Sequence, residues 1–149
     1  MRYWLVKSEP DAFGWREQVA HGTEPWTGVR NHAAKRNLMA MRRGDRAFFY
    51  HSNVGKEIVG VVEVVREAYP DPTAKEEARK GAKGGAKGGE WVAVDVKAVG
   101  PMKRPVTLAA IKEDPAFADF LLVRQARLSV MPVSEEHWHR ICELGGFHG

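Results

Sequence analysis

The sequence has 149 residues, enough for one domain of ordinary size, and 44% of them are hydrophobic and 28% charged. These proportions are typical of globular proteins and argue against disordered or fibrous classes. A single cysteine, Cys142, excludes an internal disulfide framework and a cysteine-rich zinc site. No apolar run approaches the ~20 residues of a membrane span, and the N-terminus lacks a signal-peptide pattern. We therefore expect a soluble monomer without membrane association, cytoplasmic or, in a eukaryote, nuclear.

The net charge of +4 is concentrated in one segment of the chain. Residues 79–89, RKGAKGGAKGG, contain four basic residues and no acidic one, so the remaining residues are neutral overall. This Gly-Ala-Lys repeat has no large apolar side chain to bury, which predicts a flexible loop. It also lacks the preceding strand and the Ser or Thr of a P-loop. Its basic side chains, Lys83 and Lys87 among them, are either solvated without a specific role or attract phosphate.

The first third of the chain predicts one strand and two helices. Residues 2–7 form a short aromatic and β-branched run that is typical of a strand. Residues 10–20 predict a helix that begins at a proline and ends before Gly22. Residues 30–42 predict a second helix, with apolar side chains on one face and a glycine after its end.

The remainder predicts mostly strands, followed by helices near the C-terminus. The expected strands cover residues 46–52, 58–69, 90–99 and 128–133, and the expected helices cover residues 107–112, 116–123 and a final segment between Ser134 and Gly145. Gly60 lies inside the second of these strands and predicts a bulge or a close backbone approach. No repeated strand–helix–strand pattern occurs, so we expect an α+β fold with a small, strongly curved mixed sheet or barrel surrounded by helices.

The common catalytic and metal-binding patterns are missing from the sequence. His51 and Ser52 are neighbours in a predicted strand, so their side chains point to opposite faces and cannot form a dyad. No Gly-x-Ser-x-Gly motif occurs. His137 and His139 lie about 200° apart on the last predicted helix, which is unsuitable for shared metal binding. We therefore predict no catalytic residue, no metal and no cofactor.

Aromatic residues among polar ones are the strongest functional signal. Two of the five tryptophans stand in polar surroundings, Trp26 in EPWTGVRN and Trp91 in GEWVAV. Flat aromatic side chains beside Arg, Asn and Ser are suited to stacking on a nucleobase. The run YHSN, residues 50–53, adds three hydrogen-bonding side chains after an aromatic strand. Each tryptophan, considered alone, could equally well fill the core, and the run YHSN could equally well be an ordinary strand end.

Several of these segments resemble the EVE domain. The similar segments are, in chain order, Tyr3–Pro10, Trp26–Asn31, Phe49–Asn53, Ile58–Val65, Ala68–Ala74 and Leu122–Val130. The resemblance spans nearly the whole chain and implies a single domain over residues 1–149, in the stand-alone form of the family. It implies a PUA-like fold, a small mixed β-barrel ringed by short helices, related to PUA and YTH domains. It also implies a pocket for a modified base flipped from DNA or RNA, such as methylated or hydroxymethylated cytosine.

The resemblance also assigns roles to individual residues. Trp26 is expected to stack on the flipped base, with Trp91 or Trp4 as a second wall. The remaining residues expected in the base pocket, several of them hydrogen-bonding the base edge, are Ser8, Asn31, Tyr50, His51, Ser52 and Asn53. The residues expected to contact phosphate or backbone are Lys7, Arg30, Arg124, Lys83 and Lys87.

Two other functions fit the same residues. An enzyme acting on a modified base or nucleotide would use His51 or Glu9 as its acid or base. A small-molecule sensor would bind free nucleosides in the aromatic pocket, without a salt-dependent contribution from phosphate.

Overall fold

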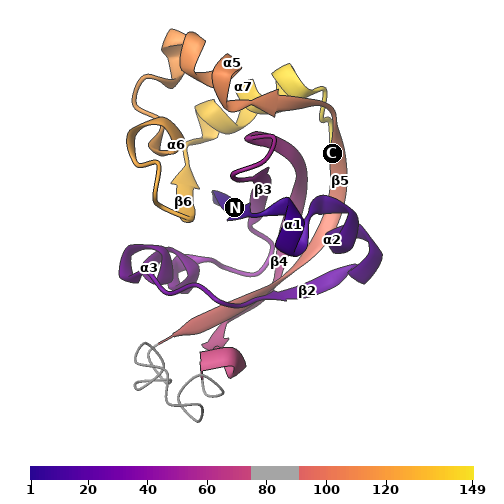
Figure 1. Cartoon of the computed structure of the whole chain (residues 1–149), viewed down its shortest axis with the longest axis vertical. Coiled ribbons are helices and arrows are strands. Elements are labelled where there is room, and N and C mark those ends of the chain that lie inside the picture. The colour runs from indigo at the N-terminus through magenta and orange to yellow at the C-terminus, as the bar shows by residue number, and fades with distance from the viewer. Residues whose placement is uncertain (75–90) are drawn as a thin grey trace.

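A computed structural model describes residues 1–74 and 91–149 (Figure 1). The predicted loop at 79–89, with Lys83 and Lys87, lies outside the described residues. The strands are β1 (Tyr3–Ser8), β2 (Thr23–Trp26), β3 (Arg46–His51), β4 (Glu57–Pro70), β5 (Val92–Thr107) and β6 (Val130–Val133). The helices are α1 (Pro10–Phe13), α2 (Trp15–His21), α3 (His32–Ala40), α5 (Leu108–Glu113), the 3-10 helix η3 (Pro115–Phe117), α6 (Leu121–Arg124) and α7 (Glu135–Gly145).

The strands form one curved, six-stranded mixed sheet in the order β2-β5-β4-β3-β1-β6. β1 and β3 run parallel, because the long connection through α1, α2, β2 and α3 returns the chain to the same end of the sheet. The pairs on either side of them, β1 with β6 and β3 with β4, are antiparallel. The long strands β4 and β5 bend around the molecule, and their register shifts at several points, as β-bulges do (Figure 1). The predicted α+β class with a curved mixed sheet is confirmed.

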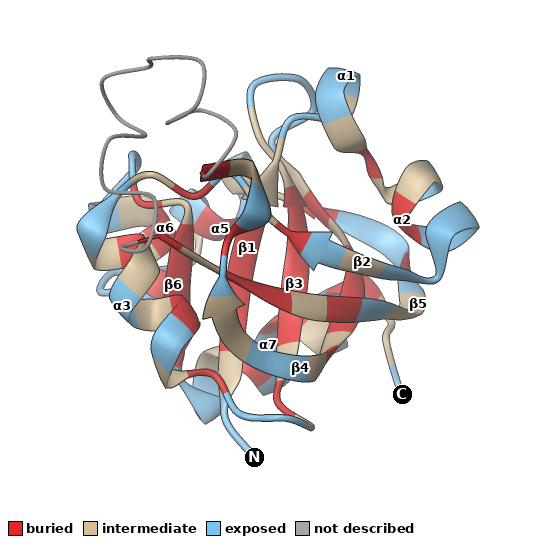
Figure 2. Cartoon of the chain, turned by 90° about the horizontal axis from the view of Figure 1, so that it is seen from below, coloured by how far each residue is buried: buried red, intermediate tan, exposed pale blue. Residues whose placement is uncertain are grey.

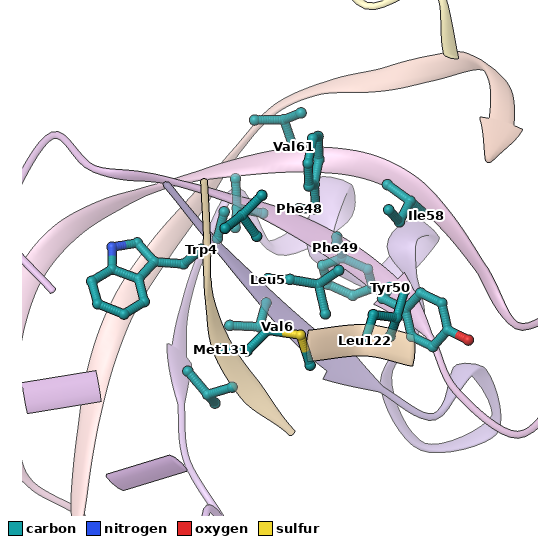
Figure 3. Close-up of a cluster of buried hydrophobic side chains, with 14 of the residues drawn as sticks. Trp4, Leu5, Val6, Phe48, Phe49, Tyr50, Ile58, Val61, Leu122 and Met131 are labelled. Atoms are coloured by element: carbon teal, nitrogen blue, oxygen red, sulfur yellow. The ribbon is translucent and has the colours of Figure 1, made fainter. Parts of the chain in front are cut away.

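The centre of the sheet supplies the core. β1 and β3 are hydrogen-bonded on both sides and covered on both faces, so they carry runs of fully buried residues (Figure 2). Figure 3 shows this cluster, with Leu5 and Val6 of β1 beside Phe48 and Phe49 of β3. Trp138 of α7 stacks on Phe48 with ring centroids 3.9 Å apart. These contacts fix the C-terminal helix against the central strands.

Side chains alternate between the two faces of β1 and β3. Phe48 packs against α7, whereas its neighbour Phe49 contacts the ring of Trp15 in α2 at 5.4 Å on the other face. The same alternation places Lys7 and Ser8, at the end of β1, on opposite sides of the sheet.

Prolines within β2 and β5 explain why the first strand was not predicted from the sequence and the second was predicted too short. β2 contains Pro25 and lies at the edge of the sheet, where a missing backbone N–H costs little. β5 continues to Thr107, past Pro101 and Pro105, rather than ending at residue 99. β2 pairs with β5 only as far as Lys97. Beyond that residue, where Pro101 and Pro105 occur, β5 is the edge strand of the described sheet.

The predicted helix over residues 10–20 is two short helices separated by Gly14. Gly14 has an extended backbone, and its N–H donates to the Glu17 carboxylate, which caps α2. The next N–H, that of Trp15, donates to Nε2 of His51 at 3.0 Å. The local cap and the tertiary contact with His51 occur together at the break in the helix, and sequence periodicity reports neither of them. The predicted helix over 116–123 is likewise divided into η3 and α6.

The other helices follow their sequence signals closely. α3 begins after Asn31 and buries Ala34 and Leu38, as its apolar face predicts. α7 begins after Ser134, whose hydroxyl accepts from the N–H of His137, and it ends at the left-handed Gly146. Within the described ranges, the helices are all too short or too polar to cross a bilayer.

Gly60 is required by the packing of Trp15. A Cβ built on Gly60 would lie 2.5 Å from the Trp15 ring, so the glycine permits both the predicted bulge and the close approach. We expect Gly60→Ala to lower the free energy of unfolding by about 1–3 kcal/mol, because the partly buried indole of Trp15 must move. Gly100→Ala is the control, since its Cβ would meet Phe147 at an ordinary 3.4 Å. Urea denaturation of both variants would measure the difference, and equal stabilities would contradict this account.

Candidate functional site

A cavity of about 280 Å³ opens beside the ends of β1 and β2. Segments far apart in the sequence form its walls, and the lining residues are Lys7, Ser8, Phe13, Glu24, Pro25, Trp26, Thr27, Gly28, Val29, Arg30 and Ser129. Its volume lies just under the range of about 300–1,000 Å³ that is typical for drug-sized ligands, and so suits a smaller flat group. Of the predicted pocket residues, it brings together Ser8 and Trp26 with the cations Lys7 and Arg30. We call it the base cavity.

The base cavity has an aromatic corner. Trp26 of β2 and Phe13 of α1 meet with ring centroids 6.3 Å apart and planes at 83°. Phe49 supports Trp26 from the sheet at 5.5 Å and 86°, which leaves the indole only 7% exposed. Such a corner accepts a flat ring stacked on one aromatic face with its edge toward the other. The second wall is thus Phe13, which the sequence analysis did not select.

Glu24 places a carboxylate in the same cavity. It lies two residues before Trp26 on β2, and its Oε1 is 2.7 Å from Nδ1 of His21. Carboxylate oxygens accept hydrogen bonds, so this side chain favours a ligand group that carries N–H or O–H donors. Glu24 is not predicted from the sequence, because Pro25 directly after it conceals the strand.

Asp71 holds the loop that closes the cavity. Its fully buried carboxylate accepts from the N–H of Gly28 at 2.8 Å, the guanidinium of Arg30 at 3.0 Å, and both the N–H and hydroxyl of Thr73. Burial by itself raises the pKa of Asp71. The hydrogen bonds from Thr73, Gly28 and Arg30 outweigh burial and lower the pKa below its usual value. The carboxylate is therefore charged and anchors both Gly28 and Arg30.

Trp91 lies behind the cavity wall rather than in it. Its indole stacks on His32 with ring centroids 4.8 Å apart, and the guanidinium of Arg30 lies 5.8 Å from its ring. Arg30 also donates to Thr73 at 3.0 Å. The predicted wall role of Trp91 is corrected to support of Arg30, which itself lines the cavity.

Two further predicted pocket residues have structural roles. Trp4 is 1% exposed, and its indole N–H donates to the buried Asp45 carboxylate at 3.0 Å, so this side chain belongs to the core (Figure 3). Asn31 accepts from the N–H of Ala34 at 2.9 Å and caps α3. Neither residue lines the base cavity, since Trp4 is buried in the core and the side-chain oxygen of Asn31 is used by the helix cap.

The YHSN run is divided between the two faces of the sheet. Tyr50, Ser52 and Asn53 line a second cavity on the α5 side. His51 points to the other face, where its Nε2 accepts from the backbone of Trp15. These four residues therefore do not form the single hydrogen-bonding set expected from the sequence.

Most of the other predicted site residues have hydrogen-bond partners within the protein. The ammonium of Lys7 donates to the carbonyl of Ala126 at 2.7 Å, and burial lowers the pKa of Lys7. Ser8 donates to the carbonyl of Phe13. Arg124 is exposed at the end of α6. Glu9 accepts from the side-chain amide of Asn53 at 2.7 Å. The two candidate acid–base groups, Glu9 and His51, thus both have hydrogen-bond partners outside the base cavity.

Removing the Asp71 carboxylate should loosen the cavity loop. We expect Asp71→Ala to lower the free energy of unfolding at pH 7 by about 1–3 kcal/mol, because buried donors lose their acceptor. The lowered pKa of Asp71 means that its contribution is present near neutral pH and is lost as the pH falls through the folded-state pKa. The gap between wild type and variant should therefore narrow in acid. Asp119→Ala, which removes an exposed carboxylate, is the control, and urea titrations that show a constant gap between wild type and Asp71→Ala would contradict the assignment.

His51 should make stability depend on pH. Burial lowers the pKa of His51, while Glu57 and Glu17 oppose this shift. The unfolded state, with a pKa of about 6.5, therefore takes up the proton first, so the contribution of His51 is present above about pH 6.5 and declines below it. His51→Gln keeps a hydrogen-bond acceptor but does not titrate. Between about pH 7.5 and 5.5, wild type should lose more stability than this variant in urea denaturation, and identical pH profiles would exclude the effect.

Comparisons with known proteins find relatives that match nearly the whole chain. An NMR structure of a protein from Rhodopseudomonas palustris is 54% identical, with a TM-score of 0.86 over 100% of this chain and 96% of that one. Mouse thymocyte nuclear protein 1 is 37% identical over 95% of this chain and 73% of its own length. The crystal structure of the human homologue, in complex with DNA containing 5-methylcytosine, is 30% identical with a TM-score of 0.84, over 100% of both chains.

A more distant structure shares the fold alone. The ASCH protein of Zymomonas mobilis is 14% identical, with a TM-score of 0.55 over 96% of this chain. The EVE domain model matches residues 2–144, which is nearly the whole chain. The curved mixed sheet, the aromatic cavity at the ends of β1 and β2, and this match lead to one conclusion: the chain belongs to the EVE domain family.

Proposed function

We propose that this protein binds a modified cytosine flipped out of a nucleic acid, without chemical conversion of the base. The observation that carries the proposal is the base cavity, in which Trp26 and Glu24 stand on one strand beside the cations Lys7 and Arg30. The human relative, solved with 5-methylcytosine DNA, supports the same ligand class.

The stacking surface and the carboxylate fit different parts of cytosine. The ring stacks on Trp26 against the perpendicular edge of Phe13, a contact worth about 1–3 kcal/mol. The carboxylate of Glu24 accepts from the exocyclic amino group, the pairing by which acidic side chains recognise cytosine. Thymine carries an oxygen at that position and would leave the carboxylate without a donor. Selection for cytosine therefore rests on Glu24.

Lys7 and Arg30 give the cavity mouth a positive charge for phosphate. Asp71 neutralises part of Arg30, but the guanidinium still lines the cavity. Charge-assisted contacts of this kind add affinity that decreases with salt. A free nucleoside lacks this contribution, so salt dependence separates nucleic-acid binding from the small-molecule sensor.

The enzyme alternative has weaker support. It would require His51 or Glu9 to reach the base, yet His51 accepts from the Trp15 backbone and Glu9 from Asn53. Incubation of the protein with modified oligonucleotides, followed by mass spectrometry of the bases, would detect any product.

Truncation of Trp26 tests the proposal directly. We expect Trp26→Ala to weaken binding of a single-stranded oligonucleotide with one 5-methylcytosine by tenfold or more, because the stacking surface is lost. Fluorescence anisotropy would measure the affinity. Trp26→Phe should retain part of it.

A matched variant separates this effect from general destabilisation. Trp138→Phe alters a buried indole that stacks on Phe48, away from the base cavity. It should reduce stability while affinity for the folded protein stays near that of wild type. If Trp26→Ala binds as tightly as Trp138→Phe, Trp26 does not stack on the base.

A further inference from the structure

A second cavity, of about 280 Å³, lies on the opposite side of the β1 and β3 ends. Three lysines, Lys7, Lys56 and Lys112, stand in its wall, and its described lining contains no carboxylate. The hydroxyl-bearing Tyr50 and Ser52 complete the polar part. We call it the basic cavity. Like charges gathered in one hollow repel one another, so the site favours an anionic occupant.

The chain holds these lysines in place through three elements. Lys7 is the last residue but one of β1, Lys56 lies in the β3–β4 turn, and Lys112 is in the last turn of α5. The turn is tied to α5 by a hydrogen bond of 2.9 Å from the N–H of Leu108 to the carbonyl of Lys56. Lys56 itself has a φ of +49°, which is uncommon for a residue with a side chain. The three lysines are therefore brought together by backbone segments whose positions are fixed by hydrogen bonds.

Lys7 lines both cavities. Its ammonium lies 5.9 Å from the Tyr50 ring and donates to Ala126, both of which line the basic cavity. The next residue, Ser8, faces the base cavity on the other side of the sheet. The two cavities thus adjoin at one strand end, where a polymer can occupy both.

We propose that the basic cavity binds a backbone phosphate of the same nucleic acid whose modified base occupies the base cavity. The inference rests on the proposed function and extends it to Lys56 and Lys112, neither of which lies in the base cavity. Phosphate oxygens accept from ammonium groups, and the hydroxyls of Tyr50 and Ser52 can donate to the same oxygens. The partial burial that lowers the pKa of Lys7 is offset when an anion is beside it.

The test measures how affinity depends on salt. Lys56→Ala, Lys112→Ala and the double variant would be compared with wild type for binding a single-stranded oligonucleotide that contains 5-methylcytosine. Each lysine removed should reduce the slope of log affinity against log salt by about 0.7, and the double variant by about 1.4. Affinity for free 5-methyldeoxycytidine should not change, because the nucleoside has no phosphate. Lys103→Ala, an exposed lysine of β5 near the end of α7, is the control.

The outcomes are distinguishable from failure of the proposed function. A slope that changes no more in the double variant than in Lys103→Ala overturns the phosphate assignment. Inorganic phosphate or poly-glutamate that competes as well as the oligonucleotide, at equal concentration of charge, also overturns it, since the occupant is then a free anion or an acidic peptide. If modified and unmodified oligonucleotides bind equally but the lysine-dependent slopes remain, modified-base recognition fails while the phosphate cavity stands.

Discussion

The parallel pairing of β1 with β3 is the constraint on which the two cavities depend. Its register places Ser8 beside His51 and Lys7 beside Tyr50 at the same end of the sheet. Side chains of paired residues face the same side of a sheet, and successive residues of a strand face opposite sides. Ser8 and His51 therefore face one side of the sheet, and Lys7 and Tyr50 face the other. A slip of one residue would exchange the two sets. The buried side chains of β1, Trp4, Leu5 and Val6, oppose that slip, because each of them would then point to the opposite face of the sheet and lose its packing partners.

The sequence predicts the class of fold and most of its elements, because apolar runs and helix caps such as Ser134 are local signals. It predicts Trp26 for a similar reason, since a tryptophan among polar residues stands out in one segment. Phe13 and Glu24 could not be selected in this way. Phe13 reaches the cavity only because the chain breaks at Gly14 through tertiary contacts, and Glu24 lies in a short edge strand that a proline conceals.

The tryptophans show how one residue type divides into several roles. Trp26 lines the base cavity, Trp91 packs behind Arg30, and Trp4 belongs to the core through its bond to Asp45. Composition alone treats them alike. Their polar partners distinguish them. The indole N–H of Trp4 donates to the buried carboxylate of Asp45, which keeps Trp4 in the core. Trp91 instead packs against Arg30, and Asp71 holds Arg30 in place by a hydrogen bond.

The edge position of β2 has a further consequence for the cavity. β2 is four residues long, pairs only with β5, and has no N–H at Pro25. A small outward displacement of this strand breaks few hydrogen bonds and leaves the central strands untouched, whereas the same displacement of β1 would disrupt both of its ladders. The cavity wall formed by β2 therefore depends on few backbone hydrogen bonds, and it is held to the central strands mainly by the packing of Trp26 on Phe49. Substitutions at positions of β2 outside this contact, such as Glu24, can change the cavity lining while the central strands keep their pairing.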